Sequence, residues 1–163
     1  MRAVSDQPDQ GADALAAVER GFELFNAGDL DTLFTEAFDP EITYRGDPDI
    51  SALAGFPTDA EGADGVRAVW EAFFAMFDEI QLTEIELIPE DGDTVLGRCH
   101  MVAQGGSSGI PIDAPFYFAW VLRDERWAFM AAKLDRDQVL AALRAWQTGR
   151  GSAAGRPDQS SQE

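Results

Sequence analysis

Three side chains of this sequence have the chemistry that acid–base catalysis needs. His100 is the single histidine, and histidine is the side chain whose unperturbed pKa lies closest to neutrality, so His100 is the best candidate for a general acid or base. Arg98 could stabilise negative charge on a carbonyl or enolate oxygen, and Tyr44 could polarise the same oxygen. We therefore predict a catalytic role for these three residues.

Each candidate also has a structural interpretation. His100 could be a neutral histidine that is hydrogen-bonded at a cavity wall, and Arg98 could pair with a carboxylate, because the chain has 30 acidic and 12 basic residues. Lys133 could line a site or simply emerge near the end of a strand. Trp70 and Phe73 could orient an aromatic ligand by stacking, although aromatic residues at helical spacing more often belong to a core.

Strand alternation predicts which face of a sheet carries these groups. We expect Leu122 to face Trp127 and Gln104 to face Ile110 across two hairpin turns. Asp113 then falls on the face opposite to Arg98 and His100, unless the hairpin slips by one residue. The two registers place one set of side chains together: Arg98, His100, Phe116, Phe118, Trp120, Leu122, Trp127, Phe129 and Lys133.

That face carries most of the apolar bulk and should be covered by helices. Because burying an unpaired charge costs several kcal/mol, the basic groups there must line a wet cavity, lie at an edge or join an ion-pair network. The residues predicted to contact a ligand are Trp70, Phe73, Phe116, Phe118, Trp120, Trp127, Phe129 and Lys133.

Apolar spacing also predicts the elements that position these groups. Residues 42–45 are typical of a short strand, and 46–62 are rich in glycine, proline and acids, so we expect a loop anchored by Ile50, Leu53 and Phe56. Three helices before the sheet and one after it are predicted over residues 13–28, 29–38, 64–77 and 135–147.

The remaining segment, from about Ile80 to Leu134, is predicted to be an antiparallel sheet. The alternation of apolar residues changes phase near Thr83 and Glu84, which indicates a bulge that bends the first strand. The following strands are expected at 94–104, 110–122 and 127–134. Helices followed by such a sheet predict an α+β fold.

The composition fits one domain between two tails. The chain has 163 residues, of which 45% are hydrophobic and 26% are charged. Residues 1–12 are expected to be a flexible N-terminal tail and residues 148–163 a disordered C-terminal tail. The net charge of -18 repels phosphate backbones and anionic lipids, so neither nucleic acid nor a membrane is an expected partner.

Cys99 is the single cysteine, so no disulfide can form within the chain. The first residues lack the apolar region of a signal peptide, and a cytoplasmic location is expected. One histidine and one cysteine without ligand spacing predict neither a metal nor another cofactor.

Several short stretches resemble the SnoaL-like, polyketide-cyclase-like branch of the nuclear transport factor 2-like superfamily over residues 13–145. Their order and spacing carry the resemblance more than any one of them does. They are Phe22-Glu23-Leu24-Phe25-Asn26-Ala27-Gly28-Asp29-Leu30-Asp31, Gly65-Val66-Arg67 leading to Phe77-Asp78, Ser108-Gly109, Leu122-Arg123-Asp124, and Leu134-Asp135-Arg136-Asp137-Gln138-Val139-Leu140-Ala141-Ala142-Leu143.

The resemblance implies a domain over residues 13–147, shaped as a cone-like α+β roll with an apolar cavity, three N-terminal helices and a short C-terminal helix. It also implies a homodimer formed through sheet surfaces. It does not imply one reaction, because the superfamily includes cyclases, steroid isomerases, epoxide hydrolases, dehydratases and members without known chemistry.

The residues at the family's reactive positions narrow these reactions. Ketosteroid isomerases have a carboxylate base after the strand that follows the second helix and an acid on the inner sheet face. Here these regions contain Tyr44 and Arg45, and Phe116, Phe118 and Trp120, none of which is an acid. Epoxide hydrolases of this fold bracket an arginine with two acids, and Asp113 lies on the wrong face of the predicted register to join Arg98.

We expect a small-molecule cavity protein that binds an apolar or aromatic carbonyl compound. If the protein is an enzyme, it would run cofactor-free chemistry of the cyclase, isomerase or dehydratase kind, with His100 moving the proton and Arg98 or Tyr44 polarising an oxygen. The alternative is a non-catalytic ligand-binding or dimerisation module of the same fold.

Overall fold

The structure is a computed structural model that describes residues 2–55, 57–90, 92–106 and 111–155. Within them one curved, six-stranded sheet has the order β2-β1-β6-β5-β4-β3, in which β1 and β6 are parallel and the other neighbours antiparallel. The strands are β1 (Phe38–Arg45), β2 (Asp59–Glu61), β3 (Glu79–Pro89), β4 (Thr94–Gln104), β5 (Ile112–Arg123) and β6 (Arg126–Lys133).

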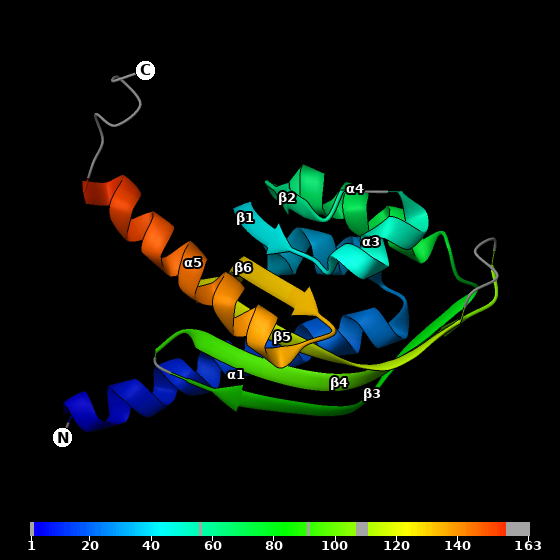
Figure 1. The fold of residues 1–163 in the computed structure, drawn as a ribbon. Helices are drawn as coiled ribbons and strands as arrows, with labels where there is room; N and C mark the ends of the chain where they lie inside the picture. The colour runs from blue at the N-terminus through cyan, green and yellow to red at the C-terminus, as the bar shows by residue number, and fades with distance from the viewer. Residues whose placement is uncertain (1, 56, 91, 107–110, 156–163) are drawn as a thin grey trace, which may run out of the picture.

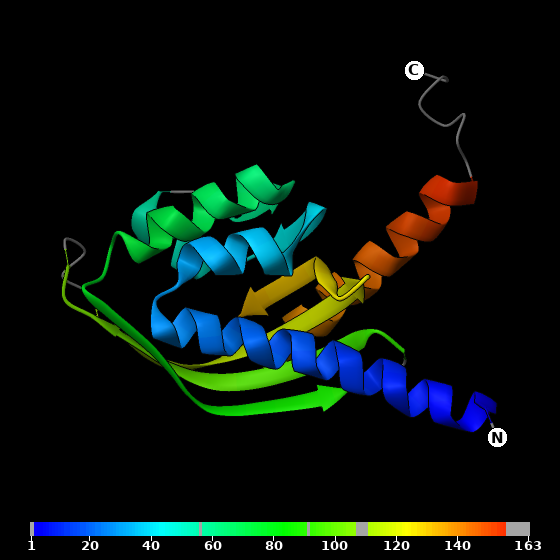
Figure 2. The same ribbon diagram turned by 180° about the vertical axis from the view of Figure 1, so that it is seen from behind.

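Helices cover both faces of the sheet. Figures 1 and 2 show α1 and α5 on opposite sides of it, with α3 and α4 forming a layer beside β1 and β2. We call the face toward α1 and α4 the inner face and the face toward α5 the outer face. The helices are α1 (Arg2–Ala27), α2 (Leu30–Thr32), the π-helical turn η1 (Leu33–Ala37), α3 (Pro48–Ala54), α4 (Ala63–Phe74) and α5 (Arg136–Gly155).

The α+β fold class is as predicted, but several boundaries differ. Helix α1 begins before the predicted start at Asp13, and α5 continues beyond the predicted end near Gln147. Strand β1 already begins at Phe38, because η1 ends there and the backbone becomes extended before Pro40. Phe56, Ser108, Gly109 and the C-terminal end of the predicted tail, 156–163, lie outside the described residues.

The prediction of a loop over 46–62 is wrong, because this segment contains α3 and β2. Asp47 caps α3, its side chain accepting hydrogen bonds from the amides of Asp49 and Ile50, and Pro48 stands at the first helical position, where no amide donor is needed. The segment between β1 and α4 therefore has regular secondary structure.

The predicted bulge in β3 is confirmed. The pairing of β3 with β4 shifts between Thr83 and Glu86, and Glu84 has a φ of 52°. An extra residue on one strand bends that strand and increases its twist. The bulge therefore contributes to the curvature seen in Figure 1.

The predicted register of β4 and β5 is wrong by one residue. Ala103 pairs with Ile112, so His100 lies opposite Pro115 and Arg98 opposite Tyr117. Because side chains alternate along a strand, a slip of one residue moves a whole set of side chains to the other face. Arg98 and His100 consequently lie on the outer face.

A second irregularity changes the end of the next hairpin. Leu122 faces Trp127 as predicted, but Val121 faces Phe129, which leaves Ala128 as an extra residue in β6. Beyond this bulge Lys133 faces Tyr117 on the outer face. The prediction that Phe129 and Lys133 share the inner face with Trp127 is therefore wrong.

The two faces have separate cores. The outer core packs Ala119, Val121, Phe129 and Ala131 against α5, and the ring of Trp146 stacks on Phe129 with 4.9 Å between centroids. The inner core is larger and aromatic. It includes Phe22, Phe34, Phe38, Trp70, Phe116, Phe118, Trp120 and Trp127.

Close packing in the inner core depends on glycine. A Cβ atom at Gly97 of β4 would lie 2.7 Å from Cζ3 of Trp120, whose side chain is completely buried. At Gly21 of α1 a Cβ atom would overlap the ring of Trp127. Larger residues at either position would displace an indole ring.

A paired arginine and aspartate join the β5–β6 hairpin to β1. The Arg123 guanidinium donates from Nε and Nη2 to the two carboxylate oxygens of Asp39, each at 3.1 Å. Asp39 is 9% exposed. The hydrogen bond from Arg123 lowers the pKa of Asp39, and burial only partly opposes this.

We predict that Arg123→Gln destabilises the protein by about 1–2 kcal/mol at pH 7, because it removes a two-point, charge-assisted hydrogen bond. A carboxylate whose folded pKa is lowered contributes stability above its unfolded pKa and loses it as the pH falls through the folded pKa. The difference between wild type and variant should therefore shrink below about pH 4. Urea unfolding of both proteins at pH 7, 5 and 3 measures this difference in the free energy of unfolding.

Arg144→Gln is the matched control, because Arg144 is an exposed arginine on α5. This change should alter the free energy of unfolding by less than about 0.5 kcal/mol. A destabilisation by Arg123→Gln that stays constant from pH 7 to pH 3 would contradict the assigned pairing.

Candidate functional site

A partly enclosed cavity of about 80 Å³ lies between the inner face of the sheet and the helices. Its walls come from elements far apart in the sequence. The helical wall consists of Gly21, Phe22, Phe25 and Leu33 from α1 and η1 and of Val69, Trp70, Phe73 and Phe74 from α4. The sheet contributes Leu82, Met101, Phe116, Phe118, Trp120, Trp127, Met130 and Ala132. We call the remaining lining residues the polar end, which consists of Tyr44, Gly46, Asp47, Ile50, Ser51 and Thr58.

The aromatic walls hold one another in place. Trp120 stacks on Phe118 at 5.2 Å and contacts Trp127 at 5.8 Å between ring centroids. Trp70 meets Trp127 at 6.3 Å and Phe38 at 5.3 Å, the latter nearly perpendicular. Such pairs add stability beyond the burial of their area, so the shape of the cavity is largely fixed before a ligand binds.

Three hydrogen-bond donors in these walls have no partner among the described residues. They are the indole Nε1 atoms of Trp70, Trp120 and Trp127, all of them buried. A buried donor without an acceptor carries a desolvation cost of about 1–3 kcal/mol. The walls are therefore mostly apolar, but they contain three indole N–H groups that have no acceptor among the described residues.

The polar end is organised around Tyr44, at the end of β1. Burial raises the pKa of the Tyr44 hydroxyl, and the negative charges of Asp47 and Asp59 raise it further. The hydroxyl therefore stays protonated throughout the physiological pH range. It can donate a hydrogen bond to a ligand oxygen, and it retains lone pairs that accept one.

Asp47 connects the polar end to the rest of the fold. One carboxylate oxygen accepts from the amides of Asp49 at 2.8 Å and Ile50 at 3.3 Å, and the other accepts from the amide of Leu134 at 2.9 Å. The side chain thus caps α3 and ties it to the residue that follows β6. Asp47 is 6% exposed and lines the cavity.

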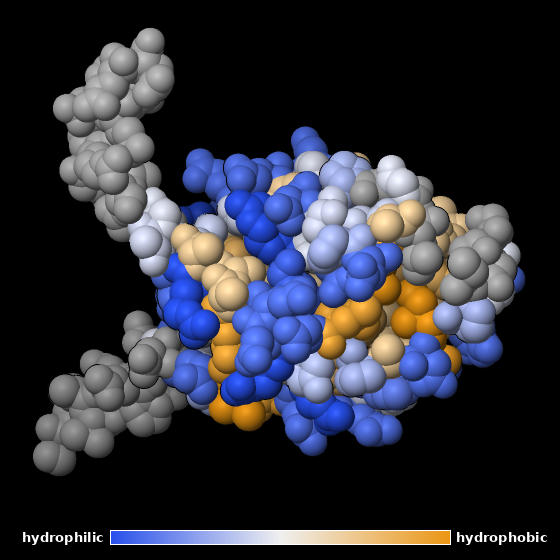
Figure 3. All heavy atoms as spheres, viewed as in Figure 1, coloured by the Kyte–Doolittle hydropathy of each residue, from blue (hydrophilic) through white to orange (hydrophobic). Residues whose placement is uncertain are grey.

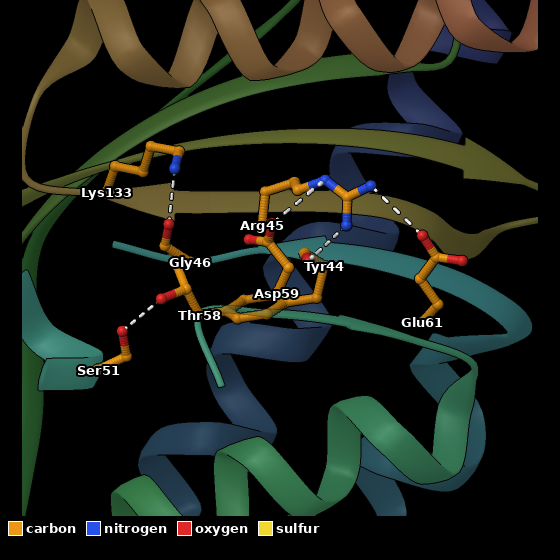
Figure 4. Close-up of polar contacts among 8 residues, drawn as sticks. All are labelled: Tyr44, Arg45, Gly46, Ser51, Thr58, Asp59, Glu61 and Lys133. Atoms are coloured by element: carbon orange, nitrogen blue, oxygen red, sulfur yellow. Dashed lines mark hydrogen bonds and ion pairs between the residues drawn. The ribbon is translucent and has the colours of Figure 1, made fainter. Parts of the chain in front are cut away.

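The backbone at Gly46 is held from two sides. Its amide donates to the carbonyl of Thr58 at 2.9 Å, and its carbonyl accepts from Lys133 Nζ at 2.6 Å (Figure 4). A Cβ atom here would lie 2.7 Å from the Thr58 carbonyl oxygen and 3.0 Å from Cε2 of Tyr44. Glycine therefore allows this turn to pack against the Tyr44 ring.

Two hydroxyls complete the polar end. Ser51 Oγ of α3 and Thr58 Oγ1 lie 2.6 Å apart and share one hydrogen bond in either direction (Figure 4). Figure 3 shows hydrophobic side chains at the molecular surface between α3 and the strands below it, on the same side of the molecule. The polar end thus lies next to an apolar surface.

The structure separates the three residues that were predicted to act together. Tyr44 lines the cavity, whereas His100 and Arg98 lie on the outer face and do not line it. His100 Nε2 contacts the carboxylate of Asp113, and a hydrogen bond with Tyr117 raises the pKa of Arg98. The prediction that His100 and Arg98 face the cavity is wrong because the β4–β5 register differs by one residue.

Six of the eight residues predicted to contact a ligand line the cavity. Phe129 and Lys133 do not, because both face outward from β6. Whether the others contact a ligand stays a prediction. The lining residues among them are Trp70, Phe73, Phe116, Phe118, Trp120 and Trp127.

The lining carboxylate of Asp47 was not among the predicted site residues. Asp47, Ser51 and Thr58 lie in the segment that was predicted to be a loop. The pair Asp47-Pro48 is a helix-start signal, with a capping aspartate before proline at the first helical position, and it would have indicated α3.

The described part of the chain has neither a cluster of metal-binding side chains nor a membrane-spanning helix. No three histidine, cysteine, aspartate or glutamate side chains in it gather closely enough to hold a metal ion. No helix in it is long and apolar enough to cross a membrane.

Solved structures share this fold, although no curated protein matches the chain in sequence. TerC, crystallised with polyporic acid, is 18% identical with a TM-score of 0.64 over 76% of this chain and 92% of its own. A candidate polyketide cyclase from Xanthomonas campestris is 14% identical with a TM-score of 0.63, covering 84% and 96%.

A candidate isomerase from Bacillus subtilis is 14% identical, with a TM-score of 0.64 over 77% of this chain and 88% of its own. These likenesses support the cone-shaped α+β roll fold. The sequence pattern of the SnoaL-like domain matches residues 18–130, which is more than half of the chain. The chain therefore belongs to the SnoaL-like domain family.

Proposed function

We propose that this protein binds a compact apolar or aromatic carbonyl compound in the inner cavity. The observation that carries the proposal is the protonated Tyr44 hydroxyl at the edge of aromatic walls. A carbonyl oxygen can accept its hydrogen bond while an apolar body packs against the rings.

The size of the cavity limits the ligand. Its volume of about 80 Å³ is far below the roughly 300–1,000 Å³ of sites for drug-sized molecules. A cavity of roughly 150 Å³ holds one benzene ring, so a ligand with one aromatic ring fits this smaller, partly enclosed cavity only if part of it extends through the open side. A structural relative, TerC, was crystallised with polyporic acid, which supports a small-molecule site in this fold.

A second candidate function is cofactor-free proton transfer of the isomerase or cyclase kind. Asp47 and Tyr44 both line the cavity, and a carboxylate beside a neutral phenol can enolise a ketone. The carboxylate would take the proton from the carbon next to the carbonyl, the C–H electron pair would form the enolate C=C bond, and the carbonyl π pair would move onto the oxygen, to which the Tyr44 hydroxyl would donate a hydrogen bond. Three backbone amides already occupy the Asp47 carboxylate, which favours binding over this step.

Acetophenone binding tests the first function. We predict a saturable change of tryptophan fluorescence in a Trp146→Phe background, which removes the indole of the outer face and leaves Trp70, Trp120 and Trp127 as reporters. Adding Tyr44→Phe should weaken acetophenone binding about three- to tenfold, because one hydrogen bond is lost. Ethylbenzene, which has no carbonyl, should bind both proteins equally.

Failure of both ligands to bind would contradict the proposed site. Equal weakening of acetophenone and ethylbenzene by Tyr44→Phe would contradict the hydrogen-bonding role of Tyr44.

Deuterium exchange distinguishes the two functions. We predict that the protein does not accelerate exchange of the acetophenone methyl protons in D2O, as followed by proton NMR, because the amide donors hold the Asp47 carboxylate. Acceleration that disappears in Asp47→Asn would establish the proton-transfer function instead.

A further inference from the structure

Charge is distributed unevenly around the cavity. Among the lining residues that the structure describes, Asp47 is the one with a charged side chain. The nearest basic groups are engaged elsewhere, since Lys133 donates to the Gly46 carbonyl and Arg45 pairs with Asp59 and Glu61 (Figure 4). The wall of the cavity is therefore negative at its polar end.

The charge of Asp47 acts on groups inside the cavity. Burial raises the pKa of the Tyr44 hydroxyl, and the negative charges of Asp47 and Asp59 raise it further. In an apolar cavity a charge is screened less than in water. A ligand carboxylate at the polar end would be repelled, and a cation would be attracted.

Tyr44 joins the polar end to the aromatic wall of α4. The Tyr44 and Trp70 rings have centroids 6.2 Å apart and meet at 73°, and Phe74 meets Trp70 at 6.0 Å and 87°. A cation within about 6 Å of an aromatic face is attracted by the negative face of the ring, most strongly by tryptophan. An aromatic wall beside a carboxylate is a combination that suits an ammonium group.

Acceptors for ammonium hydrogens are present as well. The hydroxyl oxygens of Tyr44, Ser51 and Thr58 retain lone pairs, and all three residues line the cavity. An ammonium group donates three hydrogen bonds and accepts none, so it matches acceptors and a carboxylate better than it matches a site with basic side chains.

We propose that the polar end is an ammonium subsite, so that the preferred ligands of the cavity are arylalkyl amines in their protonated form. The aromatic ring lies among Trp70, Trp120 and Trp127, and the ammonium group lies at Tyr44, Trp70 and Asp47. This inference rests on the proposed function, because it requires the cavity to be a ligand site. It is compatible with a carbonyl in the same ligand, since an amino ketone offers both groups.

A series of probes that share one ring tests the inference. Benzylamine, which is protonated at pH 7, benzyl alcohol and benzoate carry charges of about +1, 0 and -1 on similar frameworks. Their dissociation constants are measured by fluorescence titration of the Trp146→Phe protein. We expect benzylamine to bind about tenfold more tightly than benzyl alcohol, and benzoate to bind at least tenfold more weakly than the alcohol.

Two aspartate variants test whether Asp47 causes the preference for benzylamine over benzyl alcohol. Asp47→Asn removes the charge but sets an amide donor against a backbone amide, so its effect is measured as the ratio of benzylamine to benzyl alcohol affinity, which should fall about tenfold. Asp49→Asn is the matched control, because Asp49 is exposed in the first turn of the same helix and does not line the cavity. It should leave both ligands unchanged. Far-ultraviolet circular dichroism and thermal melting check that each variant folds.

The outcomes separate this inference from the proposed function. If benzyl alcohol and acetophenone bind but benzylamine is no tighter than the alcohol, the ammonium subsite is overturned and the cavity remains a ligand site. If Asp47→Asn does not fold, the wild-type series decides the question by itself. If none of the probes or acetophenone binds, the proposed function fails.

Discussion

The register between β4 and β5 determines which chemistry the cavity can carry. Pairing of Ala103 with Ile112 turns Phe116, Phe118 and Trp120 inward and Arg98 outward. The inner face is consequently lined by aromatic rings, and the basic groups of these strands interact with acids and a tyrosine on the outer face. A cavity of this composition recognises a ligand by shape, ring stacking and a few polar groups at one end.

Those polar groups depend on one carboxylate. Asp47 caps α3, binds the amide of Leu134 after β6 and lines the cavity. A residue with both roles couples the position of the short helix to the electrostatics of the site. Because the backbone at Gly46 is also held by Thr58 and Lys133, the polar end has a defined geometry without a bound ligand.

The sequence allowed the fold to be predicted better than the site. The phase change at Thr83 and Glu84 located the β3 bulge, since a bulge alters apolar alternation directly. Nothing in the alternation around Ala128 or in the turn after Gln104 distinguishes two registers, because both faces of β5 and β6 carry apolar residues. The placement of His100 followed from such a register and was wrong by one residue.

A crystal structure of the protein soaked with acetophenone would show where the carbonyl compound binds. We predict that the phenyl ring packs against Trp70 and Trp127 and that the ketone oxygen lies within hydrogen-bonding distance of the Tyr44 hydroxyl. Acetophenone bound instead on the outer face beside Arg98 and Tyr117, with the inner cavity free of it, would contradict the proposed site.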